Sequence, residues 1–318
     1  MDWINEHEHS VFRPERAVTR PEDRPGRLAV GVVGAGRVGS VLGAALRRAG
    51  HSIVGATGVS SASRERAGRL LPDVPLLPAD EVAARCDLLL LGVPDDVLGG
   101  LVEGLASTGA IRPGQIVVHP SGAYGIGVLE PALRRGGLPM ALHPAMTFTG
   151  RPEDVDRLAG VSFGVTSPPE LRPAAEVLVL EMGGEPQWVE EADRPLYHAA
   201  LAHGANHLVT LVNEAVYLLR QAGVVHPERM VAPLLSAALD NTLRLGDAAL
   251  TGPVSRGDAG TVQRHLDAIA GAAPESVAAY LALARRTADR AIAAGRLSAT
   301  AAEPLLGVLA ERPDRASS

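Results

Sequence analysis

The sequence predicts an α/β protein: an N-terminal doubly wound parallel sheet followed by an all-α C-terminal domain. From residue 28, short apolar runs alternate with helical segments, which is typical of a parallel sheet with right-handed crossovers. One run, "DLLLLGVP", is almost continuously apolar, as in a strand buried on both faces. After residue 193 only helical patterns remain. The 318 residues are enough for two domains, and we place the boundary near Glu190.

The first domain, residues 27–190, is expected to carry six strands. Helices are expected between and after them at 38–49, 63–71 and 172–183. Ligands of such sheets bind beyond the carboxyl ends of the strands, so the loops at those ends are the candidate site. The expected strands are residues 28–33, 51–57, 87–94, 115–122, 140–144 and 161–166.

The second domain, residues 191–311, is expected to be helical throughout. Pro227 and Pro274 lie near helix starts, where a missing N–H costs little. Residues 1–26, charged and interrupted by prolines, are expected to form a disordered arm without a signal-peptide core, and residues 312–318 a frayed tail. The expected helices are residues 192–223, 226–246, 258–271, 274–295 and 298–310.

The composition narrows the class of function. A chain that is 46% hydrophobic and 21% charged is typical of a soluble globular protein. Its net charge of −6 argues against a nucleic-acid surface, and no apolar run approaches the length of a membrane span. Cys86 is the only cysteine, which excludes an internal disulfide and fits a reducing cytoplasm. We expect its thiol to be buried and inert.

The chain contains no lysine: all 30 basic residues are arginine. A mechanism that needs an amine base or a Schiff base is therefore excluded.

A glycine loop, "GVVGAGRVGS", follows the first strand and opens a helix. In this context Gly34 allows the tight turn, Gly36 lets the backbone approach a pyrophosphate, and Gly39 brings helix and strand together. Exposed amides and the helix dipole then face the anion. A purely structural turn is the alternative. The expected dinucleotide-binding residues are Gly34, Ala35, Gly36, Arg37, Val38 and Gly39, with Val93 and Pro94 at the end of the third strand.

The loop after the second strand favours NADP over NAD. NAD-selective loops carry an acid about twenty residues after the glycines, which holds the ribose 2′-hydroxyl. Here no acid precedes Glu65, and Ser60, Ser61 and Arg64 suit a 2′-phosphate instead. In the alternative interpretation, these serines cap a helix and Arg64 is a solvated surface residue.

Six motifs together indicate a resemblance to a known family, which covers residues 28 to 309. They are "GVVGAGRVGS", "LLLGVPDD", "VVHPSGA", "ALHPAMTF", "LYHAALAHGANHLVTL" and "LTGPVSRGD...TVQRHL". On these motifs the chain resembles predicted oxidoreductases that join a Rossmann-like domain to a DUF2520 domain. The resemblance implies an NAD(P)-dependent oxidoreductase acting on CH–OH groups, similar to ketopantoate reductases, pyrroline-carboxylate reductases and 3-hydroxyacid dehydrogenases. Some members are linked to ketopantoate reduction in pantothenate synthesis. Reduction of a small 2-oxo acid, in particular 2-dehydropantoate, by a homodimer is therefore expected.

One departure from these relatives bears on the mechanism. Ketopantoate reductases and 3-hydroxyacid dehydrogenases commonly place a lysine four residues before an asparagine. Asn206 can fill the asparagine role, but Ala202 stands at the lysine position. The alternative to an enzyme is thus a non-catalytic dinucleotide-binding sensor.

Imidazole is the substitute proton donor, because its pKa lies near neutrality. His143 follows a strand, whereas His198 and His203 lie on the same expected helix as Asn206. Helix geometry favours His203, which shares a face with Asn206, while the family pattern favours His198. His198, His203 and His143 therefore all remain candidates for the proton donor. A structural role in the core or at a helix cap is the alternative for each helix histidine. His203 and His207 are spaced to bind zinc, but no further ligand accompanies them, and no metal is expected.

Two segments are expected to hold substrate. Ser121 and Gly122 resemble the Ser-Gly pair that binds substrate carboxylate in 3-hydroxyacid dehydrogenases. In "LTGPVSRGD", the side chains of Thr251, Ser255 and Arg256 can donate to a carboxylate. There we expect Asp258 to cap the following helix. An ordinary interhelical loop is the alternative interpretation.

Overall fold

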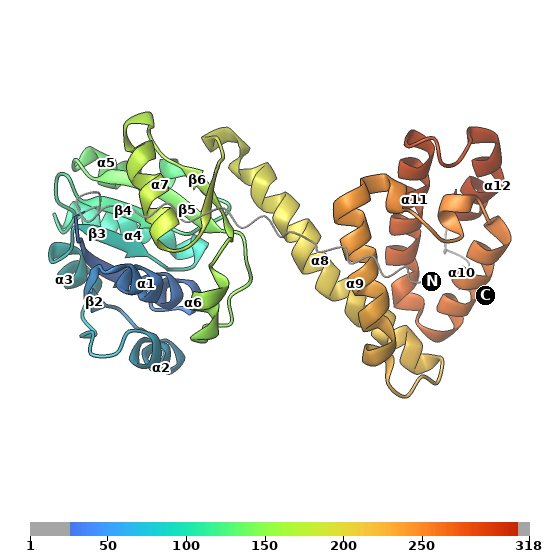
Figure 1. The fold of residues 1–318 in the computed structure, drawn as a ribbon, viewed down its shortest axis with the longest axis horizontal. Helices are drawn as coiled ribbons and strands as arrows, with labels where there is room; N and C mark the ends of the chain where they lie inside the picture. The colour runs from blue at the N-terminus through green and yellow to red at the C-terminus, as the bar shows by residue number, and fades with distance from the viewer. Residues whose placement is uncertain (1–25, 311–318) are drawn as a thin grey trace, which may run out of the picture. The chain divides into compact units, whose positions relative to one another are not determined.

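The computed structural model describes residues 26–310, so the expected arm and tail lie outside the described residues, apart from Gly26. Contacts divide the chain into two units, one through Leu201 and one from Ala202. The division falls inside a 28-residue helix, α8 (Arg194–Gln221). We describe each unit by itself (Figure 1).

The first unit is built on a seven-stranded sheet of order β2-β1-β3-β4-β5-β6-β7. Neighbouring strands are parallel except β5 and β6, which are antiparallel. The predicted α/β class is confirmed, and the six expected strands are all present. The strands are β1 (Ala29–Val33), β2 (Ser52–Ala56), β3 (Leu88–Leu91), β4 (Ile116–His119), β5 (Leu138–Pro144), β6 (Ser162–Thr166) and β7 (Glu185–Trp188).

Helices cover both faces of this sheet (Figure 1). Alternate residues of β3 point to opposite faces: Leu88 and Leu90 enter one core with α1 and α7, and Leu89 and Leu91 enter the other with α3 and α4. Burial on both faces explains the unbroken apolar run. The helices of this unit are α1 (Arg37–Ala49), α2 (Ser61–Leu70), α3 (Ala79–Ala84), α4 (Asp95–Ser107), α5 (Glu130–Arg134), α6 (Glu153–Arg157) and α7 (Arg172–Glu181).

The reversal at β6 departs from an all-parallel sheet and affects the carboxyl edge. An antiparallel neighbour starts at the edge where the preceding strand ends. The connection between β5 and β6 therefore returns to the edge at which β1, β3, β4 and β5 end. In this pairing His143 lies opposite Gly164.

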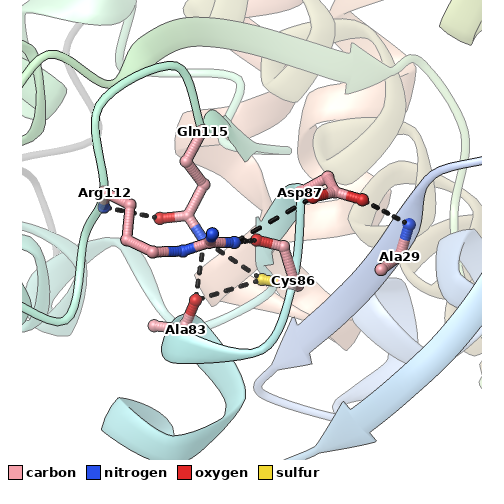
Figure 2. Close-up of polar contacts among 6 residues, drawn as sticks. All are labelled: Ala29, Ala83, Cys86, Asp87, Arg112 and Gln115. Atoms are coloured by element: carbon pink, nitrogen blue, oxygen red, sulfur yellow. Dashed lines mark hydrogen bonds and ion pairs between the residues drawn. The ribbon is translucent and has the colours of Figure 1, made fainter.

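The opposite, amino edge of the sheet is fastened by buried polar contacts (Figure 2). Gln115 donates from Nε2 to the carbonyls of Ala83 and Cys86 at 2.7 and 2.8 Å, and its Oε1 accepts the amide of Arg112. Arg112 also donates to the Cys86 carbonyl, and Asp87 accepts the amide of Ala29 at the start of β1. Cys86 is fully buried, and burial raises the pKa of its thiol to about 11. The predicted burial of the thiol is confirmed, and the raised pKa is consistent with an inert role.

The second unit contains the rest of α8 and four further helices, with a core from α10, α11 and α12. Asp258 accepts the amide of Thr261 at 3.0 Å, so the predicted cap of α10 is confirmed. In contrast, α9 leaves several leucines exposed, among them Leu234 and Leu243. These helices are α9 (Pro227–Leu245), α10 (Ala259–Ala272), α11 (Val277–Ala293) and α12 (Ala299–Ala310).

Among residues 26–310 no helix is long and apolar enough to cross a membrane.

Candidate functional site

The glycine loop between β1 and α1 is packed too tightly for side chains at two of its three glycines. Gly34 has a φ of +94°, and a Cβ there would lie 2.7 Å from the carbonyl oxygen of Gly92, which follows β3. A Cβ at Gly39 would lie 2.2 Å from the Gly34 carbonyl oxygen. Gly36, at the N-cap of α1, has room, since the nearest atom would be 3.6 Å away. The loop is therefore pressed against the end of β3, where Val93 contacts Gly34, and the space in front of Gly36 stays open.

Thr57, just beyond β2, fixes the first half of this loop. Its hydroxyl accepts the amide of Gly34 at 2.7 Å, and its carbonyl accepts the amide of Ala35 at 2.8 Å. Those two amides are used within the protein. The amides of Arg37, Val38 and Gly39 open α1, where a helix has no intrahelical acceptors for them. An anion at this loop would thus meet the first turn of α1, and the residues present fit a pyrophosphate.

The segment after β2 opens α2 with hydroxyl groups. Ser60 is the N-cap, and its Oγ accepts the amide of Ser63 at 3.1 Å. Ser61 and Arg64 are exposed, and Arg64 donates to the carbonyl of Val59 at 2.6 Å. The capping interpretation of Ser60 is confirmed. The hydroxyl of Ser61 and the guanidinium of Arg64 lie at the surface beside this helix start.

The end of β4 carries a histidine with a structural role. His119 is fully buried, donates from Nε2 to the Gly125 carbonyl at 2.8 Å, and accepts the Ser121 amide at Nδ1. Burial, more than its other surroundings, lowers the pKa of His119 to about 4. Both ring nitrogens therefore shape the turn that presents Ser121 and Gly122.

The end of β5 carries a histidine with one ring nitrogen directed at that turn. His143 is partly buried, and its Nδ1 lies 2.8 Å from the hydroxyl of Tyr197 at the start of α8. A Cβ at Gly122 would lie 3.0 Å from Nε2 of His143 and 2.7 Å from Cδ2 of His198. Gly122, His143 and His198 thus converge so closely that only glycine fits. Burial, then the nearby charge of Arg194, lowers the pKa of His143 to about 4, so its imidazole is neutral at physiological pH.

Arg194, 1% exposed, holds three segments of this edge together. Its guanidinium donates to Thr166 Oγ1 at 2.8 Å and to the carbonyls of Ser121, Ala141 and Gly164 at 3.3, 3.1 and 3.0 Å. All four acceptors are uncharged, so none of them neutralises the cation. Burial lowers the pKa of Arg194, and Glu191 partly offsets this effect.

Glu191 fastens the same segment to the loop after β4. Its carboxylate accepts the amides of Ile126 and Gly127 at 2.7 and 3.0 Å, and a Cβ at Gly125 would overlap it. The three side chains of Glu191, Arg194 and Tyr197 therefore attach the start of α8 to the ends of β4, β5 and β6.

The other predicted catalytic and substrate-binding residues lie in the second unit. They are not part of the cluster of Gly122, His143 and His198 in the first unit. His203 and His207 face each other on α8, with their Nδ1 atoms 2.8 Å apart. No group of three or more His, Cys, Asp or Glu side chains suited to a metal occurs within the described part of the chain. Asn206 lies between them in sequence and is exposed.

The "LTGPVSRGD" turn borders a cavity of about 410 Å³ within the second unit. Thr251 lines it, together with Glu214 and the hydrogen-bonded pair of His265 and Tyr280. Ser255 is buried and donates to the Gly252 carbonyl, whereas Arg256 is exposed.

Comparison with known proteins follows the two parts of the chain. The family model of a Rossmann-like domain matches residues 14–144, and that of a domain of unknown function, DUF2520, matches residues 161–287. The chain therefore contains a Rossmann-like domain and a DUF2520 domain, as its motifs predicted. No curated protein sequence matches it.

Solved structures share this architecture over most of their length. A candidate NADP oxidoreductase from Bacteroides fragilis has a TM-score of 0.68 at 20% identity, over 83% of this chain and 98% of that one. An imine reductase from a Pseudomonas species has a TM-score of 0.58 at 21% identity, over 85% and 99%. Pyrroline carboxylate reductase from Plasmodium falciparum, with NADP bound, has 0.53 at 13% identity, over 84% and 100%. At these identities the likeness establishes the shared fold.

Sequence reasoning identified Ser121, Gly122 and His143 as strand-end residues but did not anticipate Arg194 or Glu191. From sequence, an arginine in the first turn of a helix is expected to lie at the surface. The available signal was the spacing of Glu191, Arg194 and Tyr197, three residues apart, which places them near one side of a helix start.

Proposed function

We propose that this protein is an NADP(H)-dependent reductase of a small 2-oxo acid. One observation carries the proposal. The open glycine loop and the Gly122–His143–His198 cluster belong to the same unit and to the same carboxyl edge of its sheet. That edge is where ligands of such sheets bind. The structural relatives, which include proteins named as reductases and one with NADP bound, support the same class of reaction.

NADP(H) is the proposed cofactor. The first-turn amides of α1 suit its pyrophosphate, with Gly36 leaving room for close approach. Ser61 and Arg64 at the start of α2, with no acid between the glycine loop and Glu65, suit the 2′-phosphate. When bound, the reduced nicotinamide supplies the hydride. The chain's own residues must therefore hold the substrate and supply a proton.

A 2-oxo acid is the proposed substrate class because the site carries a buried positive charge. Arg194 lies directly behind the Ser121 carbonyl, and the positive potential of a buried cation favours an anion at the adjacent turn. The Gly122 turn would hold the carboxylate, and His143 and His198 would face the carbonyl. We propose 2-dehydropantoate as the particular substrate, on the family resemblance.

The test is NADPH oxidation by the purified full-length protein with a panel of 2-oxo acids that includes 2-dehydropantoate. Cyclic imines form a second arm, since relatives are described as imine and pyrroline-carboxylate reductases. We expect turnover with 2-oxo acids and tighter binding of NADPH than of NADH in titration calorimetry. NADPH binding without turnover in either arm would refute the reductase proposal.

The variant Asn206→Ala separates a reductase from a non-catalytic sensor, in which the chain only binds the dinucleotide. If Asn206 polarises the substrate carbonyl, this variant lowers turnover while NADPH affinity is kept. A sensor has no turnover, and its NADPH affinity does not depend on the side-chain amide of Asn206. Asn241→Ala is a control for an exposed helical asparagine.

A further inference from the structure

We propose that Tyr197 and His143 form a proton relay. His143 protonates the substrate, Tyr197 returns a proton to the imidazole, and Arg194 is the positioning residue. The inference rests on the proposed reductase function for its kinetic consequence. Its structural consequence, the position of the proton on His143, can be tested in the protein alone.

The geometry of His143 gives its two ring nitrogens different surroundings. Nδ1 lies 2.8 Å from the Tyr197 hydroxyl, and the two rings meet edge to face with centroids 5.6 Å apart. Nε2 points to the turn at Gly122, where an added methyl group would come within 3.0 Å of it. One nitrogen is therefore held by the protein and the other faces the proposed substrate position.

A relay is needed because the imidazole has one proton to give. The groups that face it are Arg194, His198 and His119, and each disfavours a positive charge on the ring. Together with burial they keep His143 neutral at physiological pH. A neutral imidazole that gives up its Nε2 proton must gain one at Nδ1 in the same step. Among residues 26–310, Tyr197 is the group hydrogen-bonded to Nδ1.

Arg194 makes this transfer feasible without touching the substrate. Its guanidinium carbon lies 5.7 Å from the centre of the Tyr197 ring, on the same first turns of α8. Burial raises the pKa of Tyr197 above its ordinary value, and the charge of Arg194 and a hydrogen bond from the Gly164 backbone reduce that rise. Because the guanidinium is tied to Ser121, Ala141 and Gly164, it holds Tyr197 and the Gly122 turn in fixed register.

The proposed step balances in protons and electrons. As the substrate carbon receives hydride from the reduced dinucleotide, the C=O π electrons move to oxygen. The Nε2–H bond of His143 breaks and an O–H bond forms. The Tyr197 O–H bond breaks and a bond from hydrogen to Nδ1 forms. The products are the hydroxy acid, a neutral His143 and a tyrosinate beside Arg194, which solvent water reprotonates.

The first test is nitrogen-15 NMR of the histidine side chains in the full chain without substrate, with His143 assigned by its loss in His143→Gln. We expect Nε2 of His143 to carry the proton and Nδ1 to be unprotonated at neutral pH. In Tyr197→Phe, a population with Nδ1 protonated should appear. A wild-type ring protonated at Nδ1 would overturn the proposal, whether or not a substrate is found.

The second test compares Tyr197→Phe with Tyr217→Phe, which removes the same hydroxyl from an exposed position further along α8. We expect Tyr197→Phe to lower kcat about 100-fold at neutral pH with little change in KM. Its remaining activity should rise as the pH falls toward about 4, because only a charged His143 can then give a proton. Tyr217→Phe should match the wild type.

An unchanged pH profile in Tyr197→Phe would contradict the relay even if kcat fell, since a merely structural role lowers the rate at every pH. Melting temperatures of both variants show whether the fold is kept. Loss of NADPH binding in the wild type would instead contradict the proposed function and leave the NMR result to decide the relay.

Discussion

At the scale of single residues, Arg194 is the most constrained side chain of the candidate site. Its guanidinium donates hydrogen bonds to the Ser121, Ala141 and Gly164 carbonyls and to the Thr166 hydroxyl. The side chain is almost completely excluded from water. A buried cation without a charged partner costs free energy unless all its donors are engaged. The hydrogen bonds offset that cost by joining four segments that are distant in sequence.

We predict that Arg194→Met lowers the free energy of unfolding by about 3 kcal/mol, because four buried acceptors each lose a hydrogen bond from a charged donor. Chemical denaturation followed by circular dichroism measures this loss. Arg135→Met, at an exposed position of the same unit, is the matched control and should change stability by less than about 0.5 kcal/mol. Equal stability of the two variants would show that the Arg194 network contributes nothing net.

At the scale of elements, the glycine loop separates packing from ligand binding. Gly39 is required by contact between the loop and α1, since a methyl group there would collide with a backbone carbonyl. Gly36 has an ordinary φ of −71° and free space in front of it. The fold therefore does not require a glycine at this position, whereas the proposed approach of a phosphate does.

Accordingly, Gly36→Ala should keep the wild-type melting temperature and weaken NADPH binding at least about tenfold. Gly39→Ala should lower the free energy of unfolding by about 2 kcal/mol, because backbone atoms must move. Thermal melting with and without NADPH distinguishes the two effects. If Gly36→Ala binds NADPH as tightly as the wild type, the loop is not the pyrophosphate site.

The strands that sequence alone predicted are those with a strong apolar pattern. β1 and β3 are buried on both faces, so their runs stand out. β7, "EPQW", was not expected because it is a largely exposed, polar edge strand. The antiparallel direction of β6 was not expected either. Strand direction is set by where the connection packs, and no local residue pattern encodes that.

The candidate site divides in the same way. Ser121, Gly122 and His143 could be placed at strand ends because parallel strands end at one edge. The partner of His143 could not, since Tyr197 is 54 residues away and reaches it only through the docking of α8. Contacts of this kind depend on the tertiary arrangement, which single-sequence periodicity does not report.

At the scale of the whole molecule, the second unit leaves several large apolar side chains of one helix exposed, as interaction surfaces do. On α9, Leu234 and Leu243 are 68% and 78% exposed, and Met230, Leu239 and Leu245 are exposed as well. A helix that is apolar on several sides is normally buried. We therefore propose that a second copy of the chain covers α9, giving the homodimer that the family resemblance implies.

This proposal predicts a dimer in sedimentation equilibrium at micromolar concentration and a monomer for Leu243→Asp. A charge buried in an apolar interface without a partner costs several kcal/mol, enough to dissociate a moderately stable dimer. Leu180→Asp is the matched control, because Leu180 on α7 is also an exposed leucine, at 55%, but lies in the first unit. A wild-type monomer, or dissociation by both variants, would contradict an interface on α9. If Leu243→Asp is monomeric and still binds NADPH, the dinucleotide site is complete within one chain, as the proposed function expects.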